Sequence, residues 1–223
     1  MSRIMNAAEL SVEFREICRY LGYRGTAPTP EVAEKISLCL SNLQKASVLS
    51  ETHVVLPLES PEENVLVAGE MEIHSKNLYK NMRGCHVCCL FAATIGIGCD
   101  RLIARAELTS MADAAIYQAA GAALIEAWCD VVNQEIIKEA KEKGLHARPR
   151  FSPGYGDFAL THQRDFEKIL QMAKHCGIHL TDTLLMMPSK SVTAIIGLSE
   201  TDTPCILQGC ETCDHASTCS FRR

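Results

Sequence analysis

The chain has 223 residues, of which 47% are hydrophobic and 22% are charged, and its net charge is −5. This composition is typical of a globular protein, and the interspersed charges exclude the basic patch that nucleic-acid binding requires. The charged first twenty residues exclude an apolar signal peptide, and the longest apolar stretch, residues 85–98, is shorter than the ~20 residues that cross a bilayer. We therefore expect a cytoplasmic protein that binds neither nucleic acid nor membranes.

Hydrophobic periodicity predicts three helices and three strands in the first half of the chain. In chain order these are a helix over residues 7–21, a helix beginning at Pro30, strands at 52–58 and 70–74, a helix over 75–82 and a strand at 85–94. Asn6 stands at the capping position of the first helix. The strand at 85–94 is apolar on both faces, which is typical of the centre of a sheet.

The second half begins with two helices and ends with two strands. The expected elements are helices at 101–108 (capped by Asp100), 112–143 and 162–175, a loop at 145–160 and strands at 181–187 and 191–197. Strands and helices do not alternate as regular βαβ units, so we predict an α+β fold in which a mixed or antiparallel sheet packs with long helices. Residues 1–203 form the predicted domain, and residues 204–223 form a cysteine-rich tail.

The loop between the last two helices has a distinctive sequence, Arg148-Pro-Arg-Phe-Ser-Pro-Gly-Tyr-Gly-Asp157. Its two prolines restrict the backbone, and Ser-Pro-Gly-Tyr fits a type II turn. Arg150 offers a planar fork that matches a carboxylate, and Gly154 allows a ligand to approach the backbone. These residues predict a site for the amino-acid end of a small zwitterion. The alternative, which these residues alone favour, is a stiff surface connection whose arginine pairs with a nearby acid.

The same loop resembles a known family. Arg150-x-x-x-Gly154-Tyr155 is similar to the S-adenosylmethionine-binding motif of the activation domain of cobalamin-dependent methionine synthase. PRFSPGYGD, EKILQMAKHCGI and LTDTLLMMPSKSVTAIIGLS resemble the C-terminal half of that domain. Upstream, Glu126-Ala127-Trp128 resembles a step on the family's long helix. The resemblance covers most of residues 10–200 and is sharpest over 148–199.

The resemblance implies a protein that binds S-adenosylmethionine and supports the reductive methylation of cob(II)alamin. It implies that Arg150 holds the ligand's carboxylate, that Pro153, Gly154 and Tyr155 shape the pocket, and that Glu126 meets the ammonium group or the ribose. The chain lacks the family's Asp-x-His-x-x-Gly signature for cobalamin, so the cobalamin is expected on a partner, a methionine synthase or another corrinoid protein. A reductase or flavodoxin is the expected electron donor. The tyrosines that multidomain members carry after the Ser-Val strand are absent from SETDTPCILQGC.

The tail carries four cysteines at ligand spacing, Cys205, Cys210, Cys213 and Cys219. The first three match the spacing that opens plant-type iron–sulfur proteins, and zinc can use the same ligands. Free thiols are the alternative. An electron-relay or docking protein that carries a metal in this tail, without S-adenosylmethionine binding, is therefore the second functional hypothesis.

Several other signals are interpreted as packing. Most of the remaining cysteines, including Cys85 and Cys88, are expected to be small buried hydrophobic residues. Trp128 is expected in the core with a partner for its N–H. Gly96-x-Gly98 is followed by Arg101 where a third glycine would stand, which disfavours a conventional glycine-rich methyltransferase.

Overall fold

The structure is a computed structural model that describes residues 2–23 and 25–202. The chain divides into two compact units. The first comprises residues up to His53, 92–132 and 167–192, and the second comprises 54–91, 133–166 and the described chain from Thr193. Several long elements contribute residues to both units, because the boundaries fall inside them.

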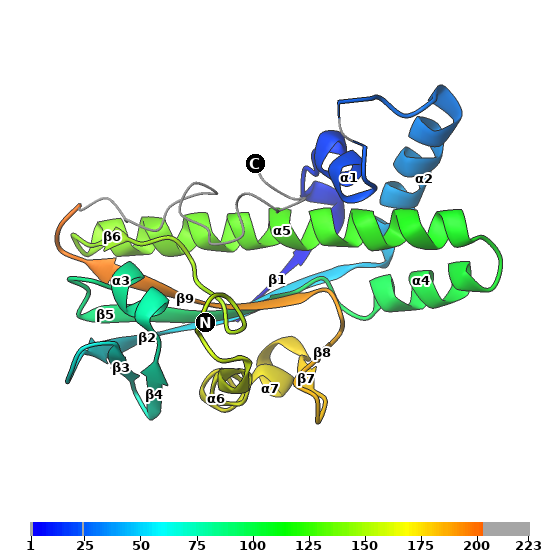
Figure 1. Cartoon of the computed structure of the whole chain (residues 1–223). Helices are drawn as coiled ribbons and strands as arrows, with labels where there is room; N and C mark the ends of the chain where they lie inside the picture. Colours follow the sequence, from blue (N-terminus) through cyan, green and yellow to red (C-terminus); the bar gives the residue numbers. More distant parts are fainter. Residues whose placement is uncertain (1, 24, 203–223) are drawn as a thin grey trace. The chain divides into compact units, whose positions relative to one another are not determined.

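The described residues form a seven-stranded sheet and a separate two-stranded hairpin (Figure 1). The large sheet has the order β4-β3-β2-β5-β9-β6, and β1 pairs with β2. The strands are β1 Ser2–Asn6, β2 Val48–Glu59, β3 Val65–Ala68, β4 Met71–His74, β5 Val87–Thr94, β6 His146–Ala147 and β9 Ser191–Ser199. The β1–β2, β2–β3, β3–β4 and β6–β9 pairs are antiparallel. The predicted α+β class is confirmed.

Helices account for much of the remaining described chain (Figure 1). They are η1 Ala7–Glu9, α1 Phe14–Tyr20, α2 Pro30–Ala46, α3 Lys76–Asn81, α4 Gly98–Glu107, α5 Met111–Glu142, η2 Leu160–His162, α6 Gln163–Leu170 and α7 Met172–Cys176. Helix α2 has proline in its first turn and Thr29 as its N-cap, as its sequence predicts. Helix α5 matches the predicted long helix to within one residue at each end.

Two expected helices are interrupted in the structure. The expected helix at 7–21 is wrong as a single element, because Asn6 caps the short 3-10 helix η1 and α1 begins only at Phe14. The expected helix at 162–175 is divided into α6 and α7, because Gln171 adopts the left-handed conformation with φ 46°. Gly177, also left-handed, ends α7 as predicted.

The expected cap at Asp100 is also wrong. Ile97 is the N-cap of α4, and Asp100 lies in its first turn. The Asp100 carboxylate instead accepts a hydrogen bond from the backbone N–H of Ser189, 89 residues further along the chain. This long-range bond links α4 to the segment before β9 and has no local sequence signal.

The strands differ from expectation mainly in number and length. Strands β1 and β3 were not expected, β6 lies within the expected loop at 145–160, and β2 is longer than the predicted 52–58. The expected strand at 181–187 is a hairpin instead, formed by β7 (His179–Leu180) and β8 (Met186–Met187). The expected strands at 85–94 and 191–197 correspond to β5 and β9, and both are buried along nearly their whole length.

Each unit has its own aromatic or aliphatic core. In the first unit Trp128 of α5 is fully buried with Leu49 and Ile36. In the second unit Phe91, Phe158 and Phe166 are among the largest fully buried side chains. Among the described residues, no helix combines the length and the apolar character needed to cross a bilayer.

A candidate ligand-binding loop

Residues 148–158, which we call the arginine loop, lie in the second unit between β6 and η2. The start of this loop is fastened to strand β9. The backbone N–H of Arg148 donates to the carbonyl of Gly197 at 2.7 Å, and Phe151 and Ile195 exchange two backbone hydrogen bonds at 2.8 and 2.9 Å. Because these bonds continue the antiparallel pairing of β6, the backbone on both sides of Arg150 is held by the sheet.

The middle of the arginine loop consists of two tight turns. The N–H of Tyr155 donates to the carbonyl of Ser152 at 3.1 Å, and Gly154 has φ 93°. Proline at the second position and a left-handed glycine at the third define a type II turn, as the sequence predicts. A second turn follows, in which the N–H of Phe158 donates to the carbonyl of Tyr155 at 3.0 Å.

The end of the loop is tied to helix α3 through the carboxylate of Asp157. Its Oδ1 atom accepts from the hydroxyl of Ser75 at 2.5 Å and from the N–H of Asn77 at 3.1 Å, and its Oδ2 accepts from the N–H of Lys76 at 2.8 Å. Both carboxylate oxygens therefore engage the first turn of α3, where backbone N–H groups lack helical partners.

These bonds change the acidity of Asp157. Burial works in the direction of a higher pKa, but the hydrogen bonds from the Ser75 hydroxyl and from the N–H groups of Asn77 and Lys76 outweigh it. The pKa of Asp157 is consequently lowered from its ordinary value. The carboxylate stays ionised at neutral pH, and its negative charge is favourable at the N-terminus of a helix.

Aromatic side chains lie beneath the loop. Phe158 is 1% exposed, and its ring centroid is 6.4 Å from that of Phe151 and 5.2 Å from that of His162. His162 in turn makes a 2.8 Å contact with the carboxylate of Asp165. Phe158 therefore serves as a buried anchor one residue after Asp157, so the end of the loop is held by apolar packing as well as by hydrogen bonds.

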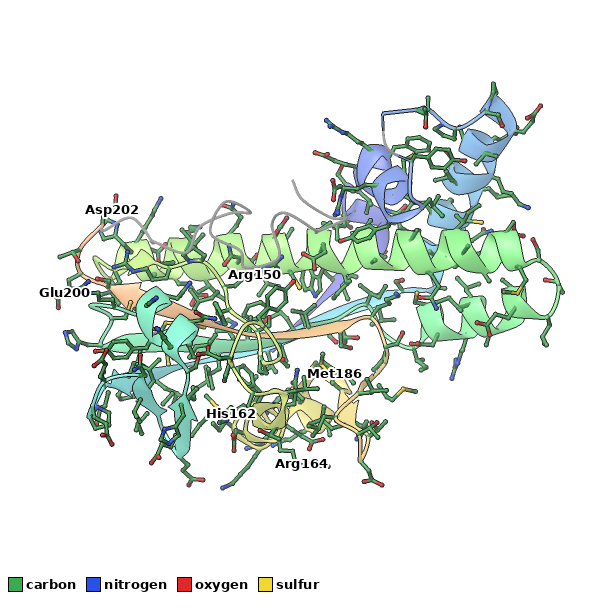
Figure 2. All side chains as sticks on the ribbon, viewed as in Figure 1. Arg150, His162, Arg164, Met186, Glu200 and Asp202 are labelled. Atoms are coloured by element: carbon green, nitrogen blue, oxygen red, sulfur yellow. The ribbon has the colours of Figure 1, made fainter. Side chains whose placement is uncertain are left out.

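The predicted residues of the loop have different degrees of exposure. Figure 2 labels Arg150 on the loop, together with His162 and Arg164 from the elements that follow it. The Arg150 side chain is half-buried, and its Nη1 atom is buried. Pro153 is buried, whereas Gly154 is exposed and Tyr155 is 71% exposed. The loop thus presents Gly154 and Tyr155 at the surface and keeps Arg150 partly covered.

The remaining predicted ligand-binding residue, Glu126, is half-buried on α5 in the first unit. Gly98 has a packing role in the same unit, because a Cβ atom there would overlap the carbonyl of Ala46 at the end of α2. This close approach explains a glycine that had suggested a nucleotide-binding loop.

The second unit also contains a cavity of about 450 Å³. Residues of β2, β3, α3 and the turn after α3 line it, among them Arg83 and Cys85, and no residue of the arginine loop does. Arg148 contacts this turn: it is 8% exposed and donates through Nη2 to the carbonyl of Arg83 at 3.2 Å.

None of the eight cysteines in the described part of the chain forms a disulfide, and all eight are buried. Burial raises the pKa of Cys88 and of Cys99 to about 12, so these thiols stay protonated at neutral pH. This confirms their interpretation as small hydrophobic residues. The predicted ligands Cys205, Cys210, Cys213 and Cys219 lie outside the described residues. Within residues 2–23 and 25–202 there is no group of three or more side chains that could hold a metal ion.

The sequence did not identify Asp157 as a functional residue, although it closes the quoted loop motif. Its partners lie about 80 residues earlier in the chain, so no local spacing connects them. The available signal was Ser75, a predicted helix start whose first-turn N–H groups need an acceptor.

The fold and the loop define an α+β domain whose arginine-bearing loop is fastened to an antiparallel sheet edge and to a helix N-terminus. Residues 78–203 match the family described as the vitamin B12 dependent methionine synthase activation domain. Because the match covers more than half of the 223 residues, the chain belongs to this family.

A comparison of folds agrees with this assignment. The structure is similar to one described as the crystal structure of the MetH reactivation domain bound to AdoHcy, with a TM-score of 0.68 and 14% sequence identity. The similarity covers 92% of this chain and 79% of that one. At this identity the likeness concerns the fold. A search of curated proteins finds no match.

Proposed function

We propose that this protein binds S-adenosylmethionine through the arginine loop and supports the reductive methylation of cobalamin held by a partner protein in the cytoplasm. The observation that carries the proposal is the fixed backbone around Arg150. The chain that contains it belongs to a family of activation domains. The solved structure of similar fold is bound to AdoHcy, which is S-adenosylhomocysteine. This supports the choice of ligand, since S-adenosylhomocysteine is what remains of S-adenosylmethionine after methyl transfer.

The chemistry requires positioning rather than acid–base catalysis. S-adenosylmethionine supplies an activated methyl group, and a reductase or flavodoxin supplies one electron to the partner's cobalt before the S–CH₃ bond breaks and the Co–CH₃ bond forms. The protein's task is to bind and orient the donor, and well-oriented reactants can lower a barrier by ~7–11 kcal/mol. The Arg150 guanidinium would hold the ligand's carboxylate, while Gly154 and Tyr155 would shape the surface beside it.

Calorimetry with S-adenosylhomocysteine tests the binding step. Wild-type protein is expected to bind, and Arg150→Ala is expected to weaken binding by about 10- to 150-fold, the value of one charged hydrogen bond. Arg164→Ala is the matched control, because Arg164 is an exposed arginine on α6 in the same unit (Figure 2). Binding that is absent in the wild type, or equal in wild type and Arg150→Ala, would refute the proposal.

The transfer step needs a second assay. Protein, reductant and S-adenosylmethionine with a labelled methyl group are mixed with a cobalamin-loaded partner domain, and label on the cobalamin is measured. Transfer that depends on the wild-type protein and falls in Arg150→Ala supports the donor role. Reduction of the cobalamin without transfer of label would contradict it.

A further inference from the structure

The two halves of the arginine loop are held in different ways. The half that carries Arg150 pairs with β9 through backbone bonds, which any side chains would allow. The half that carries Gly154 and Tyr155 folds on itself in two turns and reaches α3 through the carboxylate of Asp157. The position of the second half therefore depends on side chains: the Phe158 ring packs in the core, and the Asp157 carboxylate makes the hydrogen bonds to α3.

The carboxylate fixes this position in several directions at once. Its two oxygens accept three hydrogen bonds, one from the Ser75 hydroxyl and two from consecutive backbone N–H groups. Engaging both oxygens fixes the rotation of the carboxylate as well as its location, and bonds to an ionised acceptor are the stronger kind. The lowered pKa of Asp157 agrees with strong bonds to its charged form.

The loop backbone also lies close against α3 at the preceding residue. A Cβ atom at Gly156 would stand 2.5 Å from the side-chain Nδ2 atom of Asn77, and Gly156 has φ 54°. The loop backbone therefore lies against the Asn77 side chain, and the left-handed conformation of Gly156 favours glycine at this position.

Helix α3 has another cap of its own. The Ser75 hydroxyl oxygen accepts from the N–H of Leu78 at 3.0 Å and donates its proton to Asp157. Because a hydroxyl can do both, the helix keeps its N-cap when the aspartate is removed. The Asp157 bonds thus serve the loop, whose ordering they stabilise.

We propose that Asp157 is a positioning residue: its carboxylate holds the Gly154–Tyr155 half of the arginine loop on α3 and thereby sets the loop's affinity for the amino-acid end of its ligand. This inference rests on the proposed function. Part of the affinity that the ligand gains from Gly154 and Tyr155 is thereby attributed to Asp157, which anchors them. Removing the anchor makes the ligand bear the entropy cost of ordering these residues.

The test compares Asp157→Ala, Asp157→Asn and the control Glu63→Ala in the whole protein. Glu63 is an exposed carboxylate in the loop between β2 and β3 of the same unit. Calorimetry with S-adenosylhomocysteine should show about tenfold weaker binding for Asp157→Ala, the factor that corresponds to ordering one backbone residue. Asp157→Asn keeps one acceptor oxygen and should recover part of the loss, and Glu63→Ala should bind like the wild type.

Amide hydrogen exchange in the ligand-free protein provides a second readout. The N–H groups of Gly154, Tyr155 and Phe158 close the loop turns, so Asp157→Ala should accelerate their exchange, whereas the Leu78 N–H in α3 should stay protected. A double-mutant cycle with Tyr155→Ala tests the coupling between the two residues. Asp157→Ala should weaken binding less in the Tyr155→Ala protein than in the wild type.

The outcomes separate the two proposals. Wild-type protein that binds ligand while Asp157→Ala binds equally well overturns the positioning role and leaves the proposed function standing. Wild-type protein that binds no ligand overturns the proposed function and, with it, the assigned affinity role. In that case unchanged exchange in Asp157→Ala would show that the anchor is also wrong, and faster exchange would show that it orders the loop for another purpose.

Discussion

The indole Nε1 of Trp128 donates a hydrogen bond to the backbone carbonyl of Ser50 at a distance of 3.1 Å, and the tryptophan is fully buried. The hydroxyl of Ser50 donates at the same time to the carbonyl of Cys176 at 3.3 Å. One residue of β2 thus joins α5 to the end of α7 inside the first unit. This confirms the expectation that the single tryptophan lies in the core with a partner for its N–H.

Trp128→Phe should reduce the free energy of unfolding by about 2–4 kcal/mol, because it leaves the Ser50 carbonyl without its donor and opens a cavity. Urea unfolding followed by circular dichroism measures the loss. Tyr155→Phe is the control, since Tyr155 is 71% exposed and removing its hydroxyl should change stability by less than about 0.5 kcal/mol. Equal stability of wild type and Trp128→Phe would contradict the role of this bond.

Arg148 should tolerate methionine better than alanine. The side chain is 8% exposed, its Nε is buried and has no hydrogen-bond partner among the described residues, and its Nη2 donates to the carbonyl of Arg83. Its Cγ lies 3.3 Å from the position of a Cβ at Gly197, so the stem fills space that alanine would leave empty. We expect Arg148→Met within about 1 kcal/mol of wild type and Arg148→Ala about 2 kcal/mol or more below it.

Urea unfolding of both Arg148 variants decides between packing and charge. Arg148→Met that is as unstable as Arg148→Ala would mean that the guanidinium, rather than the stem, stabilises this part of the second unit. Arg148→Lys adds a comparison, because it keeps a charge and changes the geometry of the donor.

Cysteine labelling should show that the eight buried cysteines of the described residues are protected in the folded protein. The chain has twelve cysteines, and eight are buried in the described residues. At pH 8 a thiol with a pKa of about 12, such as Cys88, is ionised in roughly one molecule in 10,000. We expect an alkylating reagent to modify these eight only after unfolding, as read by peptide mass spectrometry. Rapid labelling of Cys88 or Cys99 in folded protein would contradict the assigned burial.

The same reagent tests the hypothesis of a metal in the tail. If Cys205, Cys210, Cys213 and Cys219 hold zinc or an iron–sulfur cluster, anaerobically purified protein should resist labelling there until a chelator is added. Analysis of iron, sulfide and zinc identifies the metal. Labelling of all four without chelator, together with the absence of these elements, would favour free thiols.

The pH dependence of Asp157 should follow from its lowered pKa. A carboxyl group whose pKa is lower in the folded state contributes stability above its unfolded pKa of about 3.9, and this contribution is lost as the pH falls through the folded value. NMR titration of the carboxyl carbon should therefore give a midpoint below about 3.9, and exchange at Tyr155 should accelerate only below it. A midpoint at or above that value would contradict the three hydrogen bonds.

The sequence predicted the longest and the most uniformly apolar elements well. Helix α5 and strand β5 have strong periodicity or continuous burial, and both occur at the expected places. Strand β1 was missed because its pairing partner, residues 48–52 of β2, lies more than forty residues away. The break at Gln171 was missed because a left-handed glutamine has no sequence signature, unlike the glycine that ends α7.

The candidate site was predicted to the extent that its geometry is local. The type II turn at Gly154 follows from four consecutive residues, and the structure confirms it. The fastening of Phe151 to Ile195 and of Asp157 to Ser75 depends on contacts across 44 and 82 residues, which no local pattern specifies. The ligand roles of Arg150, Pro153, Gly154, Tyr155 and Glu126 remain predictions that binding measurements must test.

Because the arginine loop is hydrogen-bonded to β9 at Phe151 and to α3 at Asp157, the five residues between these two attachment points must span a fixed distance. Replacing a side chain between them, as at Ser152, leaves the hydrogen bonds of Phe151 and Asp157 in place. Inserting or deleting a single residue would break the hydrogen bonds at one of these two points, whatever the residue type. Relatives that diverge widely in composition here should therefore still agree in the number of residues they place between the sheet and the helix.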